Sequence, residues 1–148
     1  MSRTYTSLHY HIVFGTKDRV PLLDAAWRGR FHEYVGGAIN GLGGYSQGVG
    51  GVADHVHLLC GLKATHCLSD VVREVKKATN AWVREVMGVR LFSWQEGYAA
   101  FTVSATARSA VKKYIANQEE HHRRRDFRAE LMDMLQVAEV DFDAEYVA

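Results

Sequence analysis

Four segments carry the hydrophobic patterning of β-strands. Residues 4–16, TYTSLHYHIVFGT, are rich in β-branched and aromatic residues and reach a glycine near their end, which is typical of a strand. The segment DHVHLLCGL at 54–62 predicts another strand, which we expect to pair with residues 44–52 as a hairpin. Residues 97–104, GYAAFTVS, predict the last strand.

Apolar residues recur at helical spacing between these strands. After the only proline, Asp24 is a candidate N-cap for a helix that ends where the glycines begin. Its apolar stripe comprises Ala25, Trp27, Phe31, Val35 and Ile39. A clearer helix has Ser69 as its candidate cap and ends at Gly88. Its apolar stripe comprises Leu68, Val72, Val75, Thr79, Trp82 and Val86, and basic residues line its other side.

The order of the elements predicts the fold class. A long helix is expected at 105–125, and residues 126–136 extend or follow it as a short amphipathic piece. The first six elements then follow the β-α-β-β-α-β order of the ferredoxin-like, or RRM-like, α+β fold. In that fold two helices cover one face of an antiparallel sheet and the other face stays open. Nucleic-acid modules hold single strands on such a face, although a fold alone assigns no function.

Composition points to a soluble protein. The chain has 148 residues, enough for one domain, with 47% hydrophobic and 24% charged residues. No apolar run approaches the roughly 20 residues that span a bilayer, and the N-terminus lacks the pattern of a secretory signal, so we expect a cytoplasmic protein with no membrane partner. Cys60 and Cys67 are accordingly expected to be reduced thiols.

Charge is unevenly distributed along the chain. The net charge is +1, but residues 129–148 hold six acidic and no basic residues. The preceding residues therefore carry 18 basic and 11 acidic side chains, a net charge of +7. A basic body with an acidic tail is compatible with a nucleic-acid partner and equally with an ordinary solvated surface. We assign 1–136 to a single domain and 137–148 to the acidic tail.

The most informative motif is HVH on the strand at 54–62. Residues two apart on a strand share a face, so His55 and His57 project together and can offer two ring nitrogens to a metal ion. Cys60 points to the opposite face, which weakens a zinc site built from these histidines and the cysteines. The pair His9 and His11 has the same spacing, and spacing alone does not separate the two pairs.

The predicted C-terminal helix supplies further candidate ligands. Tyr114 and Gln118 are four residues apart and therefore share a helical face, which His121 continues. The Gln118 amide oxygen can ligate a hard cation beside the Tyr114 phenol. Taken alone, the same spacing also suits a half-buried aromatic residue with a solvated neighbour.

With HVH on a strand and YIANQ on a later helix, the chain resembles the single-tyrosine HUH transposases, the insertion sequence two hundred family. Four stretches carry the resemblance, in the family's order: YHIVFGTKDRVPLL (10–23), GVADHVHLLCGL (51–62), FSWQEGYAAFTVS (92–104) and YIANQEEHHRR (114–124). The residues beyond about 136 carry little of it.

The resemblance implies a metal-dependent endonuclease and strand transferase that acts on single-stranded DNA. It implies that His55, His57 and Gln118 bind Mg²⁺ or Mn²⁺ and that Tyr114 is the nucleophile, on a helix that the fold adds at its C-terminal end. It also implies a homodimer in which the tyrosine helix can act in trans, and substrates with imperfect hairpins at the ends of the element. The covalent product would be a 5′-phosphotyrosine.

Basic residues give weaker expectations. The set Arg73, Lys76, Lys77, Lys112 and Lys113 is expected to track DNA phosphates, with a solvated helix face as the alternative for each. Asp54 is a candidate to orient a ligating histidine or to form a turn. Two other functions stay open: a domesticated relative that processes repeat hairpins, and a noncatalytic module that binds single-stranded nucleic acid. A zinc enzyme requires Cys60 or Cys67 to reach the histidines.

Overall fold

A four-stranded antiparallel sheet forms the centre of the molecule. The computed structural model describes residues 3–147. The strands are β1 (His9–Gly15), β2 (Tyr45–Val52), β3 (His55–Gly61) and β4 (Ala99–Thr102), in the spatial order β2-β3-β1-β4. The α-helices are α1 (Arg28–Gly41), α2 (Leu68–Glu85), α3 (Arg108–Ala116), α4 (Gln118–His122) and α5 (Phe127–Val137), and the short 3-10 helices are η1 (Lys17–Arg19) and η2 (Ala144–Tyr146).

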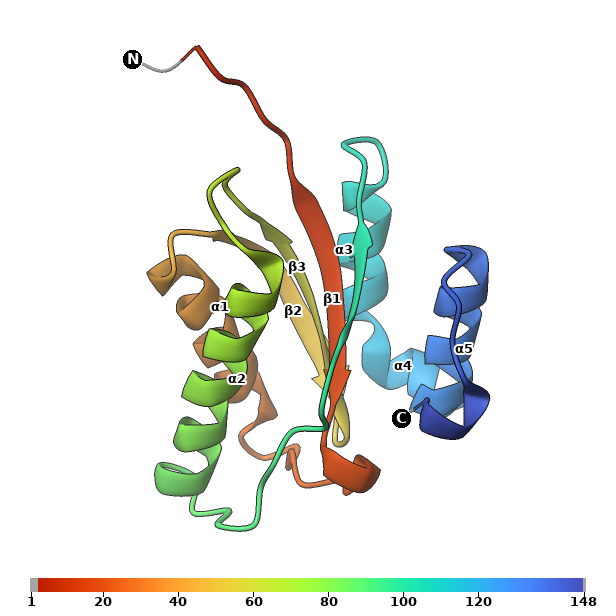
Figure 1. The fold of residues 1–148 in the computed structure, drawn as a ribbon. Helices are drawn as coiled ribbons and strands as arrows, with labels where there is room; N and C mark the ends of the chain where they lie inside the picture. The colour runs from red at the N-terminus through yellow and green to blue at the C-terminus, as the bar shows by residue number, and fades with distance from the viewer. Residues whose placement is uncertain (1–2, 148) are drawn as a thin grey trace.

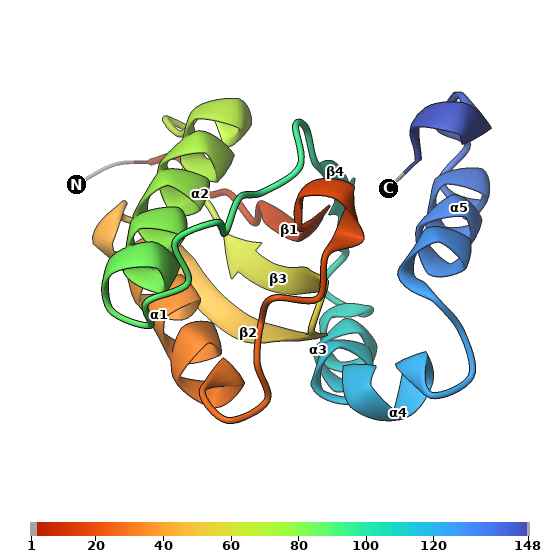
Figure 2. The same ribbon diagram turned by 90° about the horizontal axis from the view of Figure 1, so that it is seen from below.

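The helices lie in two layers (Figures 1 and 2). The helices α1 and α2 cover one face of the sheet, while α3, α4 and α5 lie on the other side. The first six elements have the predicted β-α-β-β-α-β order, and the central strands β1 and β3 pair antiparallel with Val13 opposite His57. The predicted α+β class with an antiparallel sheet is confirmed. The face that was expected to stay open is covered in part, because α3 packs on β2 and β3.

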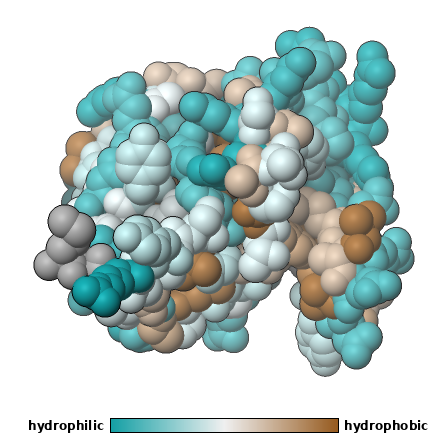
Figure 3. All heavy atoms as spheres, turned by 90° about the horizontal axis from the view of Figure 1, so that it is seen from above, coloured by the Kyte–Doolittle hydropathy of each residue, from teal (hydrophilic) through white to brown (hydrophobic). Residues whose placement is uncertain are grey.

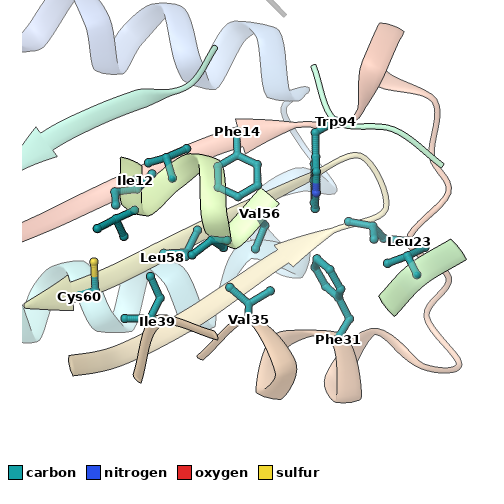
Figure 4. Packing of buried hydrophobic residues seen from close by; sticks show 14 of the residues in the cluster. Ile12, Phe14, Leu23, Phe31, Val35, Ile39, Val56, Leu58, Cys60 and Trp94 are labelled. Atoms are coloured by element: carbon teal, nitrogen blue, oxygen red, sulfur yellow. The ribbon is translucent and has the colours of Figure 1, made fainter. Parts of the chain in front are cut away.

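The main core lies between the sheet and the helices α1 and α2. Ile12, Phe14, Val56 and Leu58 point into it from the two central strands (Figure 4). Strand alternation directs the neighbouring residues to the opposite face, where a second cluster forms around Val13. The two faces of the central strands thus differ in character: one is apolar core, and the other carries histidines.

Helix boundaries differ from the predictions at several places. The helix α1 does not end where the glycines begin but continues through Gly36 and Gly37 to Gly41. The helix α1 begins at Arg28, and Asp24 instead accepts the Ala26 N–H in the preceding turn. The helix α2 begins at Leu68 after an extended Cys67, so Ser69 is inside the helix and is not its cap. The last two of these differences lie at the N-terminal end of a helix, where a sequence pattern does not fix the first helical residue to better than one or two positions.

A further difference is that the predicted helix at 105–125 is interrupted at Asn117. The backbone there has φ −99° and ψ 21°, and its N–H bonds the carbonyls of Lys113 and Tyr114. Asparagine is a poor helix former because its side chain competes for local backbone groups. The chain therefore changes direction between α3 and α4. The piece predicted at 126–136 is a separate helix, α5, capped by Asp126, whose carboxylate accepts the Ala129 N–H at 2.8 Å.

No helix among residues 3–147 is long and apolar enough to cross a membrane.

Candidate metal and nucleophile site

The strand β3 presents His55 and His57 side by side. Both side chains are fully buried, and they lie on the face that the C-terminal helices cover, because His55 contacts Gln118 of α4 and His57 contacts Glu130 of α5. Val56, Leu58 and Cys60 belong to the core on the other face, as strand alternation predicts. The zinc hypothesis fails on this geometry, because Cys60 lies across the sheet from the histidines and Cys67 is exposed at the start of α2, beside Ser69.

Gln118 and Tyr114 reach the same place from α4 and α3. The Gln118 Oε1 atom lies 3.1 Å from His55 Nε2, and Gln118 is 1% exposed, so it is not the solvated neighbour of an aromatic residue. The Tyr114 ring lies 5.8 Å from the His57 ring in an edge arrangement. The bend at Asn117 puts the two side chains on different helices, yet both converge on the histidine pair.

Glu130 lies at the centre of this group, although it belongs to none of the motifs that predicted the site. Its Oε1 atom lies 3.0 Å from His57 Nε2 and 3.2 Å from His122 Nε2. Its Oε2 atom accepts hydrogen bonds from the Tyr114 hydroxyl and, at 3.1 Å, from Gln118 Nε2. One donor atom from each of His55, His57, His122 and Glu130 fits within 4.8 Å, a spacing at which one metal ion can be held.

A signal for Glu130 was present in the sequence. The buried side chains of α5 are Phe127, Glu130 and Leu131, so the acidic residue interrupts the apolar stripe of an amphipathic helix. A charged residue in such a stripe is rarely buried unless it is paired. His122 carried no comparable signal, because its proximity to His55, with ring centroids 4.5 Å apart, depends on the bend between α3 and α4.

The imidazole tautomers test whether a cation fits here. His55 Nδ1 lies 2.7 Å from the Asp54 carboxylate, and His122 Nδ1 lies 2.6 Å from the carbonyl oxygen of Arg125. Both partners only accept hydrogen bonds, so each Nδ1 carries a proton and each neutral ring turns a lone pair at Nε2 toward oxygen atoms of the site. A lone pair facing an oxygen lone pair is repulsive unless a cation lies between them. The donor set therefore suits a divalent ion, and protons on the rings are the alternative.

Burial and hydrogen bonding set the protonation of the group. Burial by itself would raise the pKa of Glu130, but its close contacts with the ring nitrogens of His122, His55 and His57 lower it far below its usual range. Burial opposes a charge on His55, yet hydrogen bonds to Asp54 and Glu130 outweigh burial and raise the pKa of His55. Burial lowers the pKa of His57. The site accordingly holds an ionised carboxylate among imidazoles.

Tyr114 is protonated in this arrangement. Burial, followed by the hydrogen bond to Glu130 and its negative charge, raises the pKa of Tyr114 well above its usual range. A phenol in this environment becomes an effective nucleophile only when positive charge reaches it or its proton is removed during attack.

The second histidine pair separates in the structure. His11 Nε2 lies 2.8 Å from His57 Nδ1, so it supports one of the site histidines from β1. His9 lies farther along the strand and contacts Gln47 at 2.7 Å and Arg108 at 3.2 Å. Neither His9 nor His11 belongs to the group of His55, His57, His122 and Glu130 whose donor atoms lie within 4.8 Å of one another.

The basic residues predicted to track phosphates do not form one surface. Lys112 and Lys113 are exposed on α3, on the same side of the sheet as Tyr114. The residues on α2 lie on the opposite face, where Arg73 is paired with Asp70 at 3.0 Å. Lys76 donates to the carbonyls of Gln95 and Gly97 and is half-buried, which is a structural role. Lys77 is exposed on that same face.

Comparisons with known proteins agree on one family. Residues 4–118 match the family model described as "Transposase IS200 like". A crystal structure of a candidate transposase from Deinococcus radiodurans R1 superposes with a TM-score of 0.66 and 23% identity, covering 80% of this chain and 95% of that one. A REP-associated tyrosine transposase bound to a REP hairpin superposes with a TM-score of 0.60 and 14% identity, covering 82% and 73% of the two chains. No curated protein sequence matches.

Proposed function

Since the chain belongs to the IS200-like transposases, we propose that it cuts and rejoins single-stranded DNA with Tyr114 as nucleophile and a divalent metal ion at the histidine pair. One observation carries the proposal. Tyr114 and Gln118, from α3 and α4, meet two histidines of β3 that lie more than fifty residues earlier, and in this group the histidines and Gln118 are buried while Tyr114 is half-buried. A protein that only bound nucleic acid would have no need to bring these side chains together.

His55, His57 and Gln118 are the proposed ligands, with Mg²⁺ or Mn²⁺ as the ion. Imidazole nitrogens and an amide oxygen are suitable donors for such an ion, and the lone pair of His55 Nε2 already faces the site. When bound, the ion supplies Lewis-acid chemistry to a phosphate oxygen of the DNA. Asp54 holds the His55 ring in the tautomer that ligation requires.

Tyr114 carries the covalent step. Its oxygen attacks the scissile phosphorus, the bond to the 3′-oxygen of the leaving strand breaks, and that oxygen takes up a proton as the phenol loses its own. The product is a 5′-phosphotyrosine, which conserves the energy of the phosphodiester. A second DNA 3′-hydroxyl reverses the step at a new junction and frees the tyrosine, so strand transfer needs no ATP.

The proposed substrate is single-stranded DNA with hairpins at the ends of the element. One of the structural neighbours is a transposase bound to a hairpin, which makes this class of DNA the first to test. Lys112 and Lys113 are exposed on the side of the sheet that carries Tyr114 and are the best placed of the predicted phosphate contacts. Processing of host repeat hairpins would use the same residues and would differ only in the DNA that is cut.

A homodimer is part of the proposal because each chain offers one nucleophile and an exchange reaction has two ends to cut. Within a single chain, Tyr114 already lies beside His57. An active site shared between subunits would then require the α3 helix to leave this position and enter the partner.

The test is a covalent adduct on a denaturing gel. The protein is incubated with Mg²⁺ and single-stranded oligonucleotides copied from the DNA that flanks its gene. We expect an adduct with the wild type and with Tyr98→Phe, a control at a partly exposed tyrosine, and none with Tyr114→Phe. His57→Ala or a chelator should abolish it as well. An adduct that persists in Tyr114→Phe would refute the nucleophile, and cleavage that survives chelation would refute the metal.

A further inference from the structure

We infer that Glu130 is an additional protein ligand of the divalent ion, supplied by a helix beyond the residues that match the family. The inference deepens the proposed function and rests on it, because it concerns the same ion. The family match ends at Gln118, whereas Glu130 lies on α5, twelve residues later. Nothing in the motif HVH or in YIANQ indicates a carboxylate ligand.

Three imidazole nitrogens converge on one carboxylate oxygen. The Oε1 atom of Glu130 lies 3.0 Å from Nε2 of His57, 3.2 Å from Nε2 of His122 and 3.5 Å from Nε2 of His55. These side chains come from β3 and the end of α4, while Glu130 comes from α5. Donor atoms that converge in this way from separate elements are the arrangement of a metal site.

When the rings are neutral, hydrogen bonds do not pair all of the nitrogen atoms that face Glu130. Nε2 of His55 and Nε2 of His122 have no proton to donate, because the Nδ1 protons bond Asp54 and the Arg125 carbonyl. Their lone pairs then face the Glu130 carboxylate. A divalent ion turns this mutual repulsion into shared coordination, and it neutralises a carboxylate that is 2% exposed.

Apolar packing holds Glu130 in place independently of any ion. Phe127, one turn earlier on α5, stacks on the His55 ring at 4.1 Å with the planes 6° apart. Leu131 and Phe127 cluster with Val13 of β1. In Figure 3, α5 and the residues after it form a projection at the right of the sheet and its other helices, and apolar side chains lie along the hollow between the two parts. The carboxylate is therefore delivered to the histidines by a helix that is already docked.

The two oxygens of Glu130 then have different partners. Oε1 faces the rings of His55, His57 and His122, while Oε2 accepts a hydrogen bond from the Tyr114 hydroxyl and lies 3.2 Å from His121 Nε2. A carboxylate that binds the ion through one oxygen and the phenol through the other holds the nucleophile next to the ion. It also makes the site harder and more negative, which favours Mg²⁺ or Mn²⁺ over softer metals.

The test measures Mn²⁺ binding to the purified full chain by titration calorimetry, without DNA. We expect Glu130→Gln, which keeps the shape of the side chain, to weaken the affinity roughly tenfold or more. The matched control is Asp133→Asn, which removes an exposed carboxylate three residues later on the same helix and should bind Mn²⁺ like the wild type. His57→Ala should lose binding.

The outcomes separate this inference from the proposed function. Wild-type affinity in Glu130→Gln, together with loss in His57→Ala, would overturn the ligand role of Glu130 and leave the histidine site intact. Undiminished binding in His57→Ala would overturn the proposed metal site itself. An equal loss in Asp133→Asn would show that long-range charge, and not ligation, explains the effect, and would also overturn the inference.

A second measurement uses only the wild type, in case Glu130→Gln does not fold. If Glu130 binds the ion, then opening of α5 costs that ligand, and saturating Mn²⁺ should slow trypsin cleavage after Arg128 by the same factor, roughly tenfold or more. Arg128 lies on α5 two residues before Glu130. Cleavage at an unchanged rate with bound Mn²⁺ would contradict the inference.

Discussion

Gly50 lies on β2 directly beneath α3, and we expect it to control where Tyr114 sits. A Cβ atom at this position would lie 2.2 Å from the carbonyl oxygen of Ile115 and 3.0 Å from its Cγ2 atom. Carbon atoms in contact with their neighbours normally sit about 3.5 Å away, so Gly50→Ala requires α3 to move by about 1 Å. Ile115 follows Tyr114 directly, so the nucleophile moves with it.

The expected effect is measurable in two ways. Overpacking at a buried contact costs about 1–3 kcal/mol in the free energy of unfolding, which urea denaturation followed by tryptophan fluorescence resolves. A displacement of about 1 Å at a reacting group lowers the rate about 100-fold, which the rate of adduct formation reports. The substitution touches neither the histidines nor Glu130, so both effects would come from the position of α3.

Gly48→Ala is the matched control. Gly48 lies two residues earlier on β2, under the same helix, and its Cβ would meet only the Lys112 side chain at an ordinary 3.5 Å. Both substitutions reduce the entropy of the unfolded chain equally, so that effect cancels between them. If Gly50→Ala is as stable as Gly48→Ala to within about 0.5 kcal/mol and forms the adduct at the same rate, then Gly50 does not set the position of α3.

Three further predictions concern pH, thiol chemistry and salt. Burial and then the charge of Arg28 lower the pKa of His32 to about 4, so the unfolded chain takes up this proton first as the pH falls from 6.5. Stability should therefore drop by about 1–3 kcal/mol towards pH 4, and His32→Gln should remove that part of the drop in urea denaturation; an unchanged pH dependence would contradict this. Burial raises the pKa of Cys60 to about 12, so iodoacetamide at pH 8 should modify only the exposed Cys67 of the folded protein. Mass spectrometry measures the labelling of each thiol, and equal labelling of Cys60 and Cys67 would contradict the prediction. Replacing Lys112 and Lys113 by alanine should reduce the slope of log K for single-stranded DNA against log salt by about 0.7 for each phosphate that these lysines neutralise, and an unaltered slope would place the DNA elsewhere.

The local pattern of hydrophobic and polar residues was sufficient to predict the fold class and the face of the sheet on which the two histidines of the site lie. Period-two alternation in HVHLLC assigned the histidines and Cys60 to opposite faces, and the structure agrees because a strand offers no other arrangement. The same reasoning weakened a zinc site with Cys60, and the structure rules it out because Cys60 lies in the core on the opposite face. The element order was also readable, since each strand and helix carries its own periodicity.

The positions of the other residues of the site, which come from the C-terminal helices, depended on contacts between distant segments. A helical spacing of four was expected to align Tyr114 and Gln118, but the chain bends at Asn117 and the two side chains meet the histidines from separate helices. Glu130 looked like one acid among several near the C-terminus, and only the docking of α5 against His55 and Val13 shows it to be buried among imidazoles.

The division has a physical reason. Alternation and helical period follow from backbone geometry, which is the same in any chain, so the sequence by itself determined the strands, the helices and the side of the sheet on which His55 and His57 lie. Which groups face those histidines depends on how α3, α4 and α5 pack, and that depends on close contacts such as Gly50 against Ile115 and the Phe127 stack on His55. Only the tertiary structure therefore decided that a carboxylate, Glu130, completes the group around them.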